Sequence, residues 1–71
     1  MTRRTKSNEM RFSGIVFKEI VRFSRARGID SIGILKMNSL IDTCVSTASD
    51  PHKGIINLEQ VGQIIREELT A

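Results

Sequence analysis

The sequence predicts a small, mainly α-helical domain, built as a three-helix bundle over residues 13–27, 31–48 and 57–70. Apolar residues recur at helical spacing in these three segments, which are separated by glycine-containing breaks. The chain has 71 residues, which is enough for one domain only. Hydrophobic residues make up 39% of the chain and aromatic residues 4%, so the core must be aliphatic. We expect a flexible basic arm at residues 1–9 and a single helical domain at residues 10–71.

The N-terminal segment has two parts. Residues 1–9 are polar and show no hydrophobic period, which is typical of a disordered arm. Residues 10–16 alternate at first between apolar and polar side chains, as a short strand would, but they also lead directly into a helical pattern. The sequence leaves strand and helix open for this stretch.

The first helix is expected to end at Arg27. The face expected to be buried falls within an arc of about 160°, at 100° per residue; it consists of Val16, Phe17, Ile20, Val21, Phe23 and Ser24. Cations in the last turn followed by Gly28 are typical of a helix C-terminus.

For the second helix, Asp30 or Ser31 is the expected cap. The predicted buried face comprises Ile34, Met37, Leu40, Ile41, Cys44 and Val45. Ile32 and Leu35 project away from this face, and such an exposed apolar pair predicts a contact point for a partner or a second copy of the chain. The alternative is a helix that starts later, near Leu35, with Ile29 and Ile32 folded into the core.

The third helix follows a loop at residues 49–54 and one or two extended residues at Ile55 and Ile56. Asn57 is the expected cap, and Gln60 stands where a capping box requires it. One face of this helix is apolar and consists of Leu58, Val61, Ile64, Ile65 and Leu69.

An alternative fold is a dimer of the ribbon-helix-helix type. Residues 10–16 would then pair with the same strand of a second copy, followed by helices at 17–27 and 31–48. In that arrangement Arg11 and Ser13 would point at base edges in the major groove of DNA.

Charge is distributed unevenly along the chain. Residues 1–27 contain eight basic and two acidic side chains, a net charge of +6, whereas residues 28–71 carry −3. Four cations lie within an arc of about 60° on the first helix, opposite the apolar face; they are Arg11, Lys18, Arg22 and Arg25. We call these four residues the basic ridge. Glu19 is expected to lie well off the ridge, so that the positive charge of the ridge is not neutralised locally.

The basic ridge predicts binding to a polyanion. Arg3, Arg4 and Lys6 of the arm would extend it, and all seven side chains would contact phosphates of a duplex, with DNA favoured over RNA. The expected role is a regulator of transcription or a related process. The alternative partner is an acidic protein, and the chain would then be an adaptor, an inhibitor or an assembly subunit. A third interpretation is that the ridge is a solvated face that only keeps the protein soluble.

No catalytic, cofactor or metal site is expected. Cys44 lies on the apolar face of the second helix and His52 in the following loop, so the only cysteine and the only histidine do not form a cluster. One cysteine also permits no disulfide within the chain. The apolar runs reach only three or four residues, which predicts neither a secretory signal nor a membrane span. We expect a cytoplasmic or nuclear protein. We also expect a homodimer, because a chain of this size gains stability from the extra buried surface.

Overall fold

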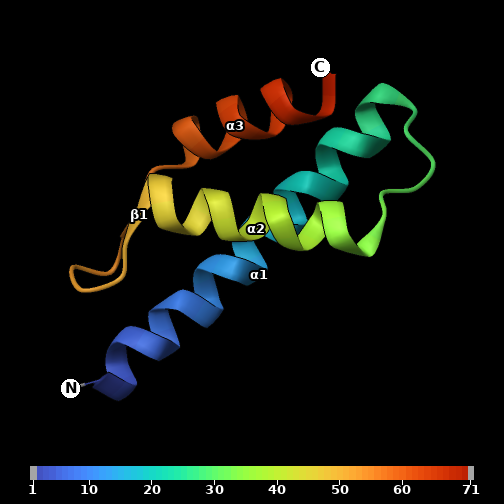
Figure 1. Cartoon of the computed structure of the whole chain (residues 1–71). Helices are drawn as coiled ribbons and strands as arrows, with labels where there is room; N and C mark the ends of the chain where they lie inside the picture. The colour runs from blue at the N-terminus through green and yellow to red at the C-terminus, as the bar shows by residue number, and fades with distance from the viewer. Residues whose placement is uncertain (1, 71) are drawn as a thin grey trace.

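The computed structural model shows three helices and one short β-hairpin (Figure 1). It describes the backbone of residues 2–70 and the side chains of residues 8–70. In chain order the elements are α1 (Thr2–Arg27), α2 (Ile34–Ala48), β1 (Ser49–Asp50), β2 (Ile55–Ile56) and α3 (Leu58–Thr70). Each helix contacts the other two, so the predicted mainly α class is confirmed and the arrangement is compatible with a three-helix bundle.

Helix α1 begins much earlier than predicted. The segment 1–9 was expected to be a disordered arm, but the helix starts at Thr2, and only residue 1 of that segment lies outside the described backbone. Two contacts explain the extension. Phe12 is 3% exposed and continues the buried face one turn before Val16. The side-chain amide of Asn8 donates a hydrogen bond of 2.6 Å to the carbonyl of Pro51, which holds this part of α1 against the hairpin.

The strand alternative for residues 10–16 is wrong, because all seven residues lie within α1. A strand would place Met10 and Phe12 on the same face. Instead Met10 is 76% exposed and Phe12 is buried, and the hydroxyl of Ser13 donates to the carbonyl of Glu9, four residues earlier, at 2.9 Å. The chain therefore does not present Arg11 and Ser13 on a ribbon.

The predicted end of α1 is confirmed at Arg27. The Gly28 N–H donates to the carbonyl of Arg25 and the Ile29 N–H donates to the carbonyl of Ser24, at 3.3 Å and 2.9 Å. This pair of bonds is a Schellman motif, which requires a left-handed residue after the helix. Gly28 supplies it with a φ of 73°.

Helix α2 starts three residues later than predicted. Its N-cap is Gly33, in an extended conformation, and no side chain caps the helix, so neither Asp30 nor Ser31 performs that role. Residues 29–33 form an irregular connection in which Ile32 packs against the core. The apolar contact of Ile32 with the core thus outweighs the capping preference of Asp30 and Ser31. This agrees with the alternative in which the helix starts near Leu35 and Ile32 folds into the core.

A β-hairpin joins α2 to α3. Ser49 pairs with Ile56 and Asp50 with Ile55. The predicted loop at 49–54 accordingly contributes two paired residues, and the extended residues at 55 and 56 are confirmed. The tight turn closes with bonds from the Lys53 N–H to Asp50 and from the Gly54 N–H to Pro51, and Gly54 has a φ of 69°.

Asn57 caps α3 as predicted, because its side-chain oxygen accepts a bond of 3.1 Å from the Gln60 N–H. The backbone N–H of Asn57 donates instead to the carbonyl of Ala48, at 2.7 Å. In the expected capping box the Gln60 side chain would accept from that N–H. The carbonyl of Ala48 therefore replaces the Gln60 side chain as the acceptor for the Asn57 N–H.

The core lies where the three helices meet. Seven residues that are at most 4% exposed form one cluster; they are Val16, Ile20, Leu40, Cys44, Ala48, Val61 and Ile65. Figure 1 shows α2 crossing α1 near its middle, with α3 beside α2 and the first turns of α1 extending past the crossing. The extension gives the molecule a length of 41 Å against widths of 22 and 16 Å.

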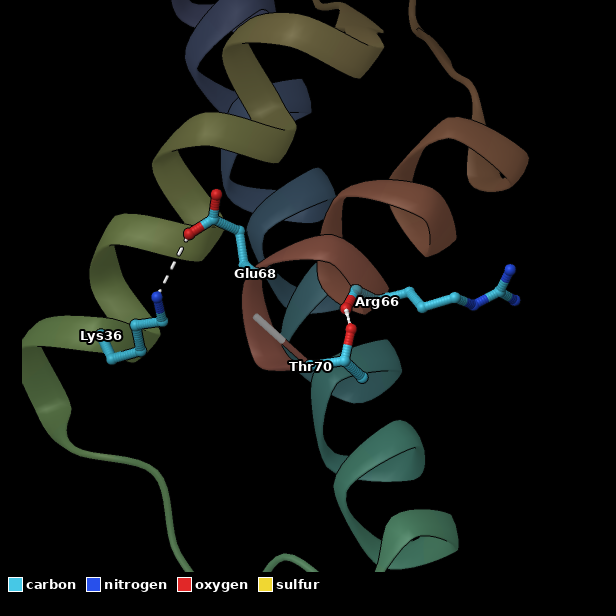
Figure 2. Close-up of polar contacts among 4 residues, drawn as sticks. All are labelled: Lys36, Arg66, Glu68 and Thr70. Carbon is cyan, nitrogen blue, oxygen red and sulfur yellow. Dashed lines mark hydrogen bonds and ion pairs between the residues drawn. The ribbon is translucent and has the colours of Figure 1, made fainter.

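One ion pair links the second and third helices at the surface. The ammonium of Lys36 lies 3.1 Å from a carboxylate oxygen of Glu68, and Figure 2 shows the two side chains reaching toward each other from α2 and α3. About half of each side chain is exposed. Pairs of this kind contribute only about 0.2–1 kcal/mol.

Candidate binding surface on α1

All four residues of the basic ridge are exposed. They lie opposite the side of α1 that is buried, where Phe12, Val16 and Ile20 are at most 3% exposed. With a rise of about 1.5 Å per residue, Arg11 and Arg25 are separated by about 21 Å along the helix axis. The ridge is therefore a straight row of cations directed away from the bundle.

The arm residues fall partly outside what the structure describes. Arg3, Arg4 and Lys6 belong to the backbone of α1, so the segment that contains them continues the helix of the ridge. Their side chains lie outside the described residues.

Glu19 lies closer to the ridge than expected. One of its carboxylate oxygens is 3.7 Å from a guanidinium nitrogen of Arg22, one helical turn away. The guanidinium side chain is 79% exposed, so the attraction is strongly screened by solvent. The prediction that Glu19 lies well off the basic ridge and does not neutralise it is therefore wrong for Arg22. The side chain of Arg22 nevertheless remains exposed to a partner.

An apolar groove lies directly beside the ridge. Phe17 and Val21 contribute its apolar wall and Lys18, Arg22 and Arg25 its charged rim, so the groove is shallow and is formed by α1 alone. Phe17 is 47% exposed, whereas the helical period placed it in the buried arc. The structure thus puts a large aromatic surface next to three cations.

The exposed apolar surface continues from the groove toward the N-terminal half of α1. Four residues form it at spacings of four, three and four, and we call them the outer stripe: Met10, Gly14, Phe17 and Val21. Met10 is 76% exposed, and a side chain added at Gly14 would meet no atom within 4 Å. Only Val21 is half-buried.

Sequence reasoning missed the outer stripe although a signal was present. The apolar arc of about 160° is wider than one packing partner covers, so one edge of it must remain exposed. Nothing in the spacing shows which edge this is. In the structure the edge that contains Phe12 and Val16 is buried, whereas Phe17 is left exposed.

The predicted apolar contact pair on α2 is not formed. Ile32 precedes the helix and packs against the core, so it is half-buried, while Leu35 is 86% exposed. Ile34, which was predicted to be buried, is 79% exposed beside Leu35. The late start of α2 accounts for the position of Ile32, which the prediction had placed within the helix.

Cys44 and His52 lie in the environments expected for them. Cys44 is 0% exposed within the core, and burial raises the pKa of its thiol, with a smaller contribution from the negative charge of Glu68. His52 is exposed in the turn of the hairpin. Among the described residues, no three His, Cys, Asp or Glu side chains come close enough together to hold a metal ion.

No described helix combines the length and apolar character that a membrane span requires. Comparisons with models of known families, with curated proteins and with solved structures found no match to this chain. Its surface chemistry must therefore carry any functional argument.

Proposed function

We propose that this protein is a non-enzymatic binding protein that recognises an acidic segment of another protein through the exposed side of α1. One observation carries the proposal: the apolar groove of Phe17 and Val21 lies within the rim of Lys18, Arg22 and Arg25. A protein partner supplies apolar side chains and carboxylates together, so it can satisfy both parts of this surface.

The two parts of the surface would contribute in different ways. Exposed cations accelerate encounter with an acidic partner and orient it, but they add little affinity because solvent screens them. Burial of a large aromatic side chain supplies affinity, since aromatic anchors dominate many interfaces. Phe17 is therefore the expected anchor, and the basic ridge steers the partner onto it.

Duplex nucleic acid, with DNA favoured and in a role such as transcription regulation, was the first expectation from the sequence and becomes the second candidate here. It is supported by the length and straightness of the basic ridge, whose four exposed cations extend over about 21 Å. Each phosphate contact would release counterions, and Arg3, Arg4 and Lys6 would add to their number. A phosphate backbone, however, has no use for the neighbouring apolar groove, so this candidate ranks second.

Two variants separate the candidates. Phe17→Ser removes the apolar anchor and keeps all charges, whereas the double variant Arg22→Glu, Arg25→Glu reverses part of the ridge. We would titrate labelled duplex DNA at two salt concentrations by fluorescence anisotropy. We would also measure capture of proteins from the source cells by the tagged full-length chain.

The proposal predicts that a protein is captured by the wild type, that both variants lose it, and that the chain has no specific affinity for DNA.

The second candidate predicts DNA binding. The logarithm of the binding constant should then fall linearly with the logarithm of the salt concentration, with a slope of about −3.6 for four phosphate contacts. In that case Phe17→Ser would leave the affinity unchanged, and such a result would overturn the proposal.

A further inference from the structure

We propose that the partner segment is an amphipathic α-helix, which lies along the outer stripe of α1 and places its carboxylates against the basic ridge. This inference rests on the proposed function and specifies the conformation and chemistry of the partner. It depends on the spacing of the stripe, on the position of the charges and on the surface that the chain leaves uncovered.

The outer stripe has the spacing by which two helices pack side by side. Met10, Gly14, Phe17 and Val21 are separated by four, three and four residues, the alternation that keeps a seam facing a neighbouring helix. In this pattern Met10 and Phe17 occupy one kind of seam position and Gly14 and Val21 the other. Any one face of a helix has this spacing, and a second helix lying along such a face can contact every position of it in turn.

Gly14 forms a gap in the stripe. No atom lies within 4 Å of the place where its side chain would begin, and the flanking side chains of Met10 and Phe17 are 76% and 47% exposed. A side chain from a neighbouring helix could insert into this gap, as a knob enters a hole in helix–helix packing. The gap also permits a close approach of the two backbones, which increases the contact area of Phe17.

The basic ridge borders the stripe at a regular interval. Arg11, Lys18 and Arg25 recur every seven residues, and the first two directly follow Met10 and Phe17. Residues at this position flank the seam and pair with charged residues on the facing helix. All three are exposed, so a partner helix with carboxylates on the facing edge would meet one cation in each successive heptad.

The charge of α1 disfavours a second copy of the chain as the occupant. Two copies packed stripe against stripe would bring together two segments that each carry a net charge of +6 over residues 1–27. In an antiparallel pair the cations at the flanking positions face each other, and like charges at such positions repel. An acidic helix of another protein removes this repulsion.

The chain also exposes more surface than a compact monomer of its size. Its accessible surface is 5368 Å² for a mass of 8.0 kDa. A compact monomer of this mass exposes about 4,450 Å². The difference is about 900 Å². The first turns of α1 contribute to this difference, because they extend past the crossing with α2 (Figure 1).

The test uses the full chain and three synthetic peptides. The first has Leu at seam positions and Glu at flanking positions over three heptads. The second has the same composition in scrambled order, and the third is polyglutamate of the same length. We would measure affinity by anisotropy and helix content by circular dichroism on mixing. Labelled duplex DNA would serve as a fourth ligand, and sedimentation equilibrium would give the oligomeric state without peptide.

We expect the patterned peptide to gain helix on binding and to bind at least tenfold more tightly than the scrambled one. Phe17→Ser and Gly14→Phe should each weaken this binding by about tenfold or more, since every 1.4 kcal/mol lost is a factor of ten. Leu35→Ser is the matched control, because Leu35 is 86% exposed but lies on α2, outside the stripe. It should leave the affinity unchanged.

Equal affinity for the patterned and scrambled peptides would overturn the helical partner but leave the proposed function in place. Binding of neither peptide would overturn both. A dimer that Phe17→Ser converts to a monomer would identify a second copy as the occupant. DNA binding that does not depend on Phe17 would assign the surface to nucleic acid.

Discussion

Replacing Ile20 and Phe17 in turn tests which edge of the apolar arc of α1 is buried. Ile20 is 0% exposed and Phe17 is 47% exposed. Truncating a buried Ile to Ala costs about 2–5 kcal/mol in free energy of unfolding. A chain of this size has a net stability of only about 3–5 kcal/mol. We therefore expect Ile20→Ala to be largely unfolded at room temperature. Ile20→Val should remain folded, with a loss of about 1 kcal/mol and a Tm lowered by about 4–8 °C.

Phe17→Ala provides the contrast. A fully buried Phe would lose about 3–5 kcal/mol on truncation, which equals or exceeds the loss at Ile20. Because about half of Phe17 is in solvent, we expect a loss of about 1 kcal/mol, half of what full burial of such a side chain contributes. The losses in unfolding free energy for Phe17→Ala and Ile20→Val are measured by urea denaturation at two protein concentrations, followed by far-ultraviolet circular dichroism. A loss of about 3 kcal/mol or more at Phe17→Ala, the value for a fully buried Phe, would show that the stripe is covered in the free protein and would refute the reasoning.

Three further perturbations test other parts of the structure. Gly28→Ala should destabilise the protein by about 1–2 kcal/mol, because an alanine is strained at the φ of 73°. Gly14→Ala, in the interior of α1 with open space around it, should stabilise by about 0.5–1 kcal/mol in the same denaturation experiment. Asn57→Ala removes the cap of α3 and should cost about 0.5–2 kcal/mol, whereas Asn57→Asp should retain most of the stability. Since burial raises the pKa of Cys44 above its ordinary value of 9.0, the folded state favours the neutral thiol, so its contribution to stability is full below that pH and falls as the pH rises above it. Unfolding free energies of the wild type and Cys44→Ala should therefore converge in alkaline solution, and a constant difference would contradict the burial of the thiol.

Several parts of the fold were predictable because they depend on residues close together in the chain. Gly28 after two cations predicts the end of α1, and Asn57 before an apolar period predicts the start of α3. Both are confirmed by the backbone geometry and by the capping bond. The position of the basic ridge was predictable for the same reason, since a regular helix fixes the angle between its own residues.

The starts of α1 and α2 were not predictable from local patterns. The extension of α1 to Thr2 is supported by Asn8, whose hydrogen bond reaches Pro51 across 43 positions in the sequence. The late start of α2 depends on Ile32 packing against the core, which displaces the local capping residues Asp30 and Ser31. Long-range contacts support both differences, and the pattern within a single segment does not contain these contacts.

The sequence alone determined that the chain forms amphipathic helices, where all three helices end and where α3 begins, and that one side of the first helix is cationic. Each of these follows from spacing within one segment. Only the tertiary structure decided which part of the wide apolar arc of α1 is buried. An isolated helix presents Phe12, Phe17 and Ile20 alike, whereas in the folded chain Phe12 and Ile20 are buried and Phe17 is not. The candidate binding surface exists because packing partners cover less than the apolar arc that the sequence offers.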